Sequence, residues 1–277
     1  MEELLQLDVK KIIGDRLPAS KRKLVPNFAL SAIEKLIHQD ELNKILRFAH
    51  PAEGSDFSAK VIEYLGIKVE VEGLNKLTKG GRYVFASNHP LGGLDGITLV
   101  EVLGKKFGDD NVRFLVNDML LNVTPLKKVF LPINKYGAQG RQAAVAINEA
   151  YESDKEIVVF PAGLVSRRLD SGKIQDLTWQ KAFVAKAIEY NRQIVPVHFE
   201  ALNRPRFYNI ARWRKKLGVK VNLEQVLLPA ELVAAHGARF RIIFGRPITA
   251  EWMRAKIEAG ENPATIAAAI RKIVYEL

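Results

Sequence analysis

The chain has 277 residues, 48% of them hydrophobic and 26% charged, which is the composition of a globular protein long enough to bury a sizeable core. Its 42 Lys and Arg against 31 Asp and Glu give a formal charge of +11, which favours an anionic partner such as phospholipid headgroups, nucleic acid or a phosphorylated cofactor. The absence of cysteine excludes disulfides, thiolate metal sites and a cysteine nucleophile.

Neither export nor a membrane span is predicted. The chain begins with acidic residues and has no basic region followed by an apolar core, so no secretory signal is expected. The longest charge-free apolar stretches, such as 157–166, are much shorter than the roughly 20 residues that cross a bilayer. We therefore expect a cytoplasmic protein that meets a membrane, if at all, only at its surface.

The first 66 residues are predicted to form helices and turns. Ser31, followed three residues later by Glu34, makes a capping-box pattern, and the apolar residues beyond it repeat at helical spacing, which predicts a helix over 32–49. The preceding segment 21–28 is both basic and apolar, as suits docking on an anionic bilayer. A solvated charge cluster ahead of a packed helix fits it equally well. Residues 1–66 are thus expected to be a helical N-terminal extension.

From residue 67 onwards short β-rich runs alternate with helical ones, which is typical of an α/β domain with a largely parallel sheet covered by helices. Strands are predicted at 67–71, 83–87, 112–116, 156–160, 194–199 and 240–244, and helices at 97–106, 142–152 and 179–190. A last helix is predicted over 263–275, with Asn262 as N-cap and proline at its first position. No internal repeat or low-complexity linker divides 67–277 further.

Two unusual segments, 88–96 and 161–168, follow predicted strands, and a third follows the run Phe130-Leu131-Pro132-Ile133. In open α/β sheets, ligands bind beyond the carboxyl ends of the strands, where loops leave for helices. We therefore expect these loops to converge on one cleft.

The segment 88–96 contains the best candidates for chemistry. His89 can take a proton near neutral pH, and a carboxylate such as Asp95, bonded to its other ring nitrogen, would fix its tautomer. Gly92 and Gly93 would let the chain fold back so that the two side chains meet. The same spacing is equally compatible with Asp95 as a helix N-cap only and His89 as an ordinary loop histidine.

Other catalytic patterns are missing from the sequence. It has no Gly-x-Ser-x-Gly elbow, no His-Glu-x-x-His pair and no Gly-x-x-x-x-Gly-Lys-[Ser/Thr] phosphate loop. A covalent acyl-enzyme therefore lacks an obvious nucleophile. What remains is direct attack by an acceptor hydroxyl or amine whose proton passes to His89, which is general-base catalysis.

Three blocks in order, His89 to Asp95, Phe160-Pro161-Ala162-Gly163, and 194–197, resemble those of the lysophospholipid/glycerolipid acyltransferases over roughly residues 67–205. The resemblance implies an acyltransferase-like domain over 67–277, with core motifs at 80–205. It also implies a histidine base oriented by an aspartate, acyl-CoA or acyl carrier protein as donor, and a glycerol-phosphate-like acceptor.

The sequence departs from the commonest pattern of this family in three places. Five residues instead of four separate His89 from Asp95, Ala162 replaces a glutamate, and Lys135 stands nearest to a position usually held by arginine. The combination of His-Pro-x-Gly-Gly-x-Asp, Phe-Pro-Ala-Gly and a following Ser-Arg looks like the hemolysin-related branch, which includes O-acyltransferases of ornithine and glycine lipids. The acceptor there carries a carboxylate, which Arg167, or else Arg168 or Lys135, could hold by charge-assisted hydrogen bonds. A solvated basic loop is the alternative for this arginine pair.

We therefore expect His89 and Asp95 to be catalytic. The predicted substrate-binding residues are Asn88, Gly92, Gly93, Lys135, Phe160, Pro161, Gly163, Ser166 and Arg167. Expected partners are acyl-CoA or acyl carrier protein, a lyso-lipid acceptor and the anionic inner face of the cell membrane, with no nucleic acid, cofactor or metal. The rival interpretation is a catalytically silent peripheral lipid-binding protein, and nucleic-acid binding rests on the net charge alone.

Overall fold

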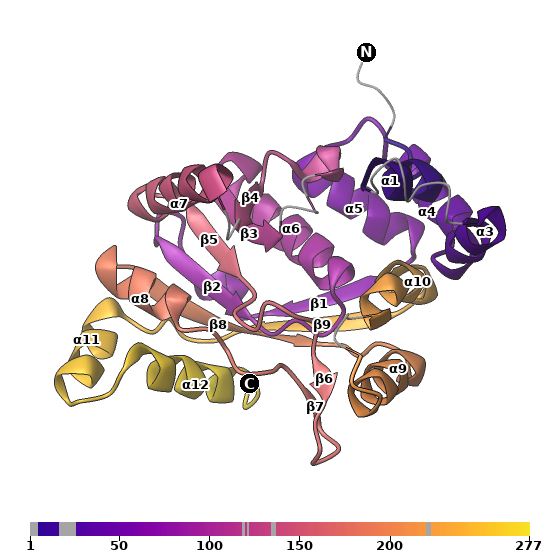
Figure 1. Cartoon of the computed structure of the whole chain (residues 1–277). Coiled ribbons are helices and arrows are strands. Elements are labelled where there is room, and N and C mark those ends of the chain that lie inside the picture. The colour runs from indigo at the N-terminus through magenta and orange to yellow at the C-terminus, as the bar shows by residue number, and fades with distance from the viewer. Residues whose placement is uncertain (1–4, 17–25, 118–119, 121, 134–136, 220–222) are drawn as a thin grey trace.

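A seven-stranded sheet with strand order β1-β9-β8-β2-β5-β3-β4 runs through the molecule (Figure 1). The computed structural model describes residues 5–16, 26–117, 120, 122–133, 137–219 and 223–277. The strands are β1 (Lys68–Glu72), β2 (Tyr83–Ser87), β3 (Val112–Asn117), β4 (Phe130–Ile133), β5 (Glu156–Val159), β8 (Gln193–Glu200) and β9 (Arg239–Phe244). A separate antiparallel hairpin joins β6 (Arg167–Arg168) to β7 (Ile174–Gln175).

The sheet is largely parallel, as predicted. β8, β2, β5, β3 and β4 are parallel, whereas β9 is antiparallel to β8 and parallel to β1. The central strand β2 is buried at all five positions because it is paired on both sides and covered on both faces. The carboxyl ends of the five parallel strands lie at the same edge, so the predicted loops do leave from one side of the sheet.

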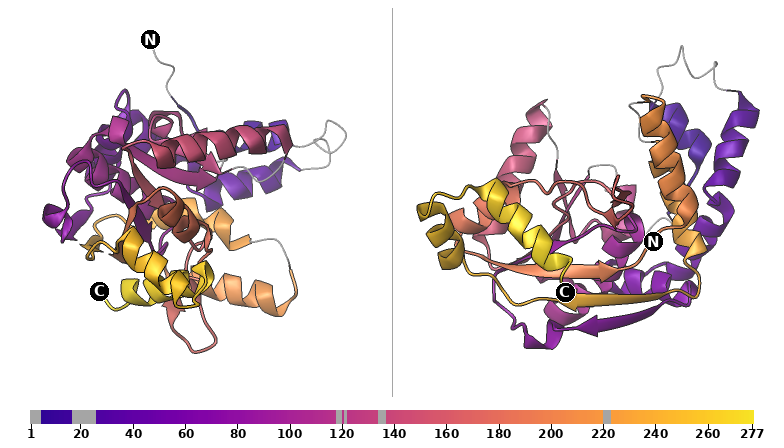
Figure 2. Two further views of the ribbon diagram at one scale, coloured as in Figure 1. Left: turned by 90° about the vertical axis from the view of Figure 1, so that its left-hand side faces the viewer. Right: turned by 90° about the horizontal axis from the view of Figure 1, so that it is seen from below.

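Helices cover both faces of the sheet (Figures 1 and 2). One face packs against α5 (Gly54–Tyr64) and α6 (Gly93–Phe107), and the other against α8 (Ala182–Glu189), α11 (Ala250–Glu258) and α12 (Pro263–Val274). The remaining α-helices are α1 (Val9–Arg16), α3 (Asn27–Leu36), α4 (Gln39–Ala49), α7 (Gly137–Glu152), α9 (Pro205–Lys216) and α10 (Leu228–Ala234). Short 3₁₀ turns occupy Leu74–Lys76, Asp109–Asn111, Thr124–Leu126 and Leu223–Leu227. No helix in the described ranges is long and apolar enough to span a bilayer.

The predicted helix over 32–49 is wrong, because the chain forms two helices there. His38 has a left-handed backbone with φ of 57°, which ends α3 and starts α4 in a new direction. Ser31 lies inside α3 and caps nothing. The two apolar faces also cover different clusters: Ile45 of α4 joins the main core, whereas Leu36 of α3 packs beside α9. The helical spacing of apolar residues continues through His38, so no local pattern in the sequence indicates the break.

The other predicted elements agree closely with the structure. Asn262 caps α12 as expected, with Oδ1 accepting hydrogen bonds from the N–H groups of Ala264 and Thr265 at 2.9 and 3.1 Å. The helix predicted at 179–190 starts only at Ala182. Of the basic segment 21–28, residues 21–25 lie outside the described residues, so its predicted role in docking stays a prediction.

A buried carboxyl group joins the amino ends of the two central strands. Glu156, only 1% exposed at the start of β5, accepts a hydrogen bond of 2.5 Å from the N–H of Tyr83 at the start of β2. Burial raises the pKa of Glu156 to about 7. Between about pH 4.5 and pH 7 the folded protein therefore keeps a proton that the unfolded chain has lost, and the free energy of unfolding falls as pH rises through that window.

Replacing this carboxyl group by an amide should remove the pH-dependent loss of stability. We expect Glu156→Gln to be more stable than the wild type by about 1–3 kcal/mol at pH 8, with the difference shrinking towards pH 4.5. Urea denaturation at several pH values measures this, with the exposed Glu152→Gln as the control. Parallel stability curves for the Glu156→Gln variant and the wild type would contradict the assignment.

Candidate active site

The loop between β2 and α6 brings His89 and Asp95 into contact. His89 lies two residues beyond the end of β2, and Asp95 lies in the first turn of α6. Nδ1 of His89 lies 3.1 Å from each carboxylate oxygen of Asp95. The longer spacing of five intervening residues is therefore compatible with the pairing on which the predicted chemistry depends.

Asp95 also organises the loop itself. Its fully buried carboxylate accepts hydrogen bonds from the N–H groups of Leu91, Gly92 and Gly96 at 2.9, 3.2 and 2.7 Å. Gly92 has φ of 82°, a backbone conformation that residues with a side chain rarely adopt, so the bend favours glycine. The carboxylate of Asp95 thus bonds the backbone at the start of α6 and also contacts the ring of His89. The two sequence-based interpretations of Asp95, helix cap and partner of His89, are therefore compatible.

The surroundings of His89 favour its protonated form. Burial alone would lower the pKa of His89, but the charge of Asp95 and its hydrogen bond outweigh burial, and Asp176 acts in the same sense, so that the pKa is raised above its ordinary value. Arg167 opposes this shift. Because Nδ1 faces a carboxylate, it carries a proton in the neutral ring, which leaves Nε2 as the basic nitrogen.

The imidazole of His89 is held in place and remains accessible. It stacks on Phe160, which follows β5, with ring centroids 4.2 Å apart and an interplanar angle of 29°. The His89 side chain is 19% exposed, and Nε2 has no hydrogen-bond partner among the described residues. The nitrogen that would accept a proton is therefore available to a ligand.

A second buried carboxylate, Asp176, fixes the backbone beside the histidine. Its Oδ1 accepts from the N–H of His89 at 3.1 Å and from the hydroxyl of Ser166 at 2.6 Å, and its Oδ2 accepts from Nε1 of Trp179 at 2.9 Å. The N–H of Ser166 in turn donates to the carbonyl of His89 at 2.8 Å. Burial raises the pKa of Asp176, against the hydrogen bonds from these groups. The loops after β2 and β5 are thereby joined, as the sequence predicts.

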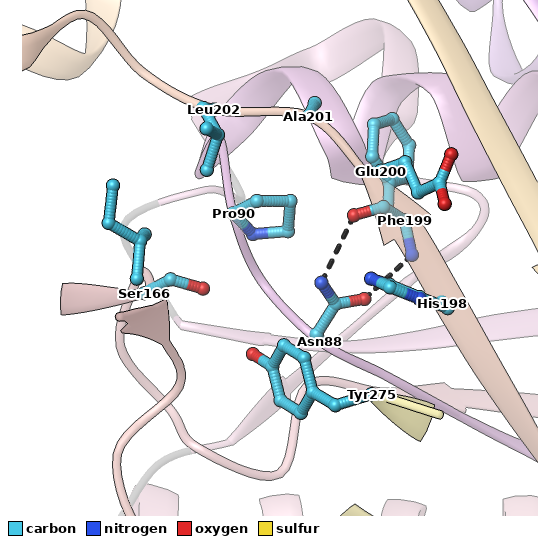
Figure 3. A pocket seen from close by; sticks show the side chains of 10 residues that line it. Asn88, Pro90, Ser166, His198, Phe199, Glu200, Ala201, Leu202 and Tyr275 are labelled. Carbon is cyan, nitrogen blue, oxygen red and sulfur yellow. Dashed lines mark hydrogen bonds between the residues drawn. The ribbon is translucent and has the colours of Figure 1, made fainter. Parts of the chain in front are cut away.

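A pocket of about 480 Å³ opens beside this junction, at the carboxyl end of β8. Figure 3 shows Asn88 lying between Tyr275 and His198, with Pro90 and Leu202 on the opposite wall. The complete lining is Asn88, Pro90, Ser166, Ile174, His198, Phe199, Glu200, Ala201, Leu202 and Tyr275. Apolar side chains together with amide, hydroxyl, imidazole and carboxylate groups, the last from Glu200, suit an amphipathic ligand.

Several predicted binding residues hold the site together. Oδ1 of Asn88 accepts from the N–H of Phe199 at 2.7 Å, and Nδ2 donates to the carbonyl of Phe199 at 3.1 Å, which clamps the end of β2 to β8. The carbonyl of Pro161 accepts from the N–H of Gln180 at 2.9 Å. Asn88, Phe160, Pro161 and Ser166 thus surround the histidine, and their contact with substrate stays a prediction.

Arg167 is held internally and is not a solvated loop residue. It donates to Glu224 at 2.9 Å and to the carbonyl of Val165 at 2.7 Å, and it lies over the ring of Phe207 at 5.2 Å. Its side chain is 11% exposed, and Glu224 is fully buried and also paired with Arg214 at 2.8 Å. Most of the hydrogen-bonding capacity of Arg167 is therefore used within the fold. Lys135 lies outside the described residues.

The N–H groups of two predicted substrate-binding glycines, Gly92 and Gly163, are already bonded within the fold. The N–H of Gly92 donates to Asp95, and that of Gly163 donates to the carbonyl of Phe160 at 2.9 Å. The N–H groups of Gly93 and Leu94, at the start of α6, have no acceptor in the described part of the chain. A developing oxyanion would find its donors there, at the positive end of a helix. Within the described ranges, no group of three His, Asp or Glu side chains could hold a metal ion.

Sequence reasoning missed Asp176, His198 and Tyr275. Asp176 lies three residues before the buried Trp179, and only this spacing hints at the bond between them. Burial lowers the pKa of His198, whose Nδ1 is buried and has no hydrogen-bond partner among the described residues. Tyr275 accepts from the N–H of Asp176 at 2.7 Å across 99 positions, which no local pattern could indicate.

Comparison with known proteins identifies the family of the chain. The sequence matches the model of a family described as acyltransferase over residues 11–275. The chain belongs to this acyltransferase family. Two lyso-glycine lipid O-acyltransferases, from Phocaeicola vulgatus and Bacteroides thetaiotaomicron, are each 40% identical over 276 residues; the matches cover 100% of this chain and 96% and 99% of theirs.

A solved structure also resembles the chain. The crystal structure of the 1-acyl-sn-glycerophosphate acyltransferase PlsC from Thermotoga maritima aligns with a TM-score of 0.47 and 12% identity, over 96% of this chain and 86% of that one. The expectation of an acyltransferase from the three sequence blocks is confirmed by the family match.

The contact between His89 and Asp95 predicts a shift in pH dependence. In Asp95→Asn the charge that raises the pKa of His89 is lost, so the acidic limb of kcat/KM should move to lower pH. Turnover should also fall on the order of a thousandfold because the amide no longer selects the Nδ1–H tautomer. Steady-state kinetics across the pH range measure both effects. A lower melting temperature with an unchanged pH limb and unchanged turnover would leave Asp95 as a helix cap only.

Proposed function

We propose that this chain is an O-acyltransferase that moves a fatty acyl group from acyl-CoA or acyl carrier protein to the hydroxyl of a lyso-glycine lipid. The family match and the named activity of two full-length relatives support the reaction and the acceptor. The observation that carries the mechanism is the pairing of His89 Nδ1 with Asp95, which leaves Nε2 without a partner among the described residues.

In the proposed reaction, Nε2 of His89 takes the proton of the acceptor hydroxyl as its oxygen attacks the thioester carbonyl carbon. The N–H groups of Gly93 and Leu94 stabilise the resulting oxyanion, a contribution of about 3–4 kcal/mol in comparable sites. The tetrahedral intermediate then collapses with cleavage of the C–S bond. The imidazolium returns its proton to the thiolate, and the products are an ester and a free thiol.

The pocket beside the loop provides a place for the acceptor. Its apolar walls suit the acyl chain of an N-acylated amino acid, and its mouth contains the carboxyl end of β8 and the hairpin that follows Ser166. Arg168 has no carboxylate partner among the described residues and bonds only Asn209, at 3.4 Å, so it is more available than Arg167 for the acceptor carboxylate. The lipid acceptor places the protein at the inner surface of the cell membrane.

Removing the proposed base should abolish acyl transfer while preserving the fold. We expect His89→Ala to lower the rate of thiol release from acyl-CoA or acyl carrier protein by about 10²–10⁴, with lyso-glycine lipid as acceptor. The exposed His236→Ala variant is the matched control and should turn over like the wild type.

The same assay distinguishes the competing assignments. Normal thiol release by a folded His89→Ala variant would reject the mechanism. Turnover of lysophosphatidic acid without turnover of lyso-glycine lipid would reject the acceptor. Wild-type protein that binds these lipids and releases no thiol from any donor would instead be a silent lipid-binding protein.

A further inference from the structure

Helix α9 has one buried face and one exposed face. Phe207, Tyr208 and Ala211 are buried against the rest of the fold. The opposite side, which we call the outer face of α9, consists of Arg206, Arg212, Trp213, Lys216 and the adjoining Leu217, all exposed. At 100° per residue these positions share one side of the helix, so they form a single surface.

This outer face carries an unusual excess of positive charge. The segment 204–217 contains six basic residues and no acidic one. Arg204 pairs with Glu231 and Arg214 with Glu224, which neutralises two of the six. The other four have no carboxylate partner in the described ranges. The excess of positive charge that the composition shows for the whole chain is therefore concentrated in this segment.

Large apolar side chains stand among these charges. Trp213 is 64% exposed and Leu217 is 73% exposed, and Nζ of Lys216 lies over the Trp213 ring at 5.7 Å. Exposed tryptophan and leucine beside Lys and Arg are typical of helices that lie in the interface of a bilayer, where rings enter the headgroup region and cations meet lipid phosphates. If the charge of this surface served only to keep copies of the protein apart, exposed apolar side chains would not be needed beside it.

The helix lies next to the candidate active site. Leu202, which lines the pocket and is 64% exposed, comes three residues before α9. On the buried side, Phe207 packs with Val165 of the loop after β5. Leu36 of α3 packs against the same cluster, and Figure 2 shows α9 projecting on the same side of the molecule as the N-terminal helices. At the start of α3, Phe28 is 78% exposed.

We propose that the outer face of α9 binds the surface of an anionic phospholipid bilayer and brings the pocket beside Leu202 to the lipid headgroups. The proposal that the membrane supplies the acceptor rests on the proposed function, whereas the binding surface itself does not. An acidic carrier protein would also be complementary to the positive charge of this face. The exposed Trp213 and Leu217 favour the bilayer, because their burial there adds a hydrophobic contribution to the electrostatic one.

Two variants separate the contributions of this surface. Trp213→Ala/Leu217→Ala removes its apolar part, and Arg212→Gln/Lys216→Gln removes two of its three unpaired basic residues, the third being Arg206. The matched control is Trp252→Ala on α11, since Trp252 is 41% exposed and has Nζ of Lys256 over its ring at 5.4 Å. Circular dichroism confirms that each variant is folded. Co-sedimentation is measured with phosphatidylcholine vesicles with and without phosphatidylglycerol, over a range of salt concentrations.

We expect the wild type to bind the vesicles containing phosphatidylglycerol, with affinity falling as salt rises. The charge variant should bind these vesicles about thirtyfold more weakly, the apolar variant at least about tenfold more weakly, and Trp252→Ala like the wild type. Thiol release with a short-chain donor and a short-chain acceptor, both water-soluble, should be unchanged in both α9 variants.

Vesicle binding by both α9 variants at the wild-type level would overturn the proposal. So would a loss of affinity for acyl carrier protein with vesicle binding retained, which would assign the face to the donor. Failure of the proposed function can be distinguished from failure of this inference. In the first case wild-type protein would release no thiol from soluble substrates, while the vesicle measurements would still test the outer face of α9.

Discussion

The active-site geometry depends on the buried carboxylate of Asp95. The N–H groups of Leu91 and Gly92 in the loop, the N–H of Gly96 in α6 and the ring of His89 all converge on its two oxygen atoms. A buried carboxylate without partners would be strongly unfavourable, so the loop must fold to supply these donors. In this fold the ring of His89 contacts the first turn of α6 through Asp95. The bend that permits this is at Gly92, whose positive φ is rarely adopted by a residue with a side chain.

The sheet determines what this pair can act upon. Parallel strands release their loops at one edge, and Asp176 then ties the loop after β2 to the loop after β5 through hydrogen bonds to His89 and Ser166. The end of β8 is fixed to the same place by the amide of Asn88. The pocket at this edge is therefore lined by residues that these hydrogen bonds hold beside the loop of His89, among them Asn88 and Ser166.

The sequence predicted the parts of this arrangement that depend on local pattern. Strand-like runs located β2, β5 and β8, and the order of blocks around His89, Phe160 and the later strand indicated an acyltransferase. It could not predict partners distant in the chain. Arg167 looked free to bind an acceptor carboxylate, but Glu224, 57 positions away, occupies it. Asp176 and Tyr275 meet only because α12 packs on the sheet, and the break at His38 follows from two helices covering different surfaces.

The ionisation of His89 tests the central claim most directly. Nuclear magnetic resonance of protein labelled with ¹⁵N in its histidine rings reports the tautomer and the pKa of each imidazole, and the His89→Ala variant assigns the signal. The contact with Asp95 predicts that His89 is protonated at Nδ1 in its neutral form and that its pKa lies above the ordinary 6.5. A proton on Nε2 at high pH, or a pKa below 6.5, would show that Asp95 does not orient the ring and would contradict the account.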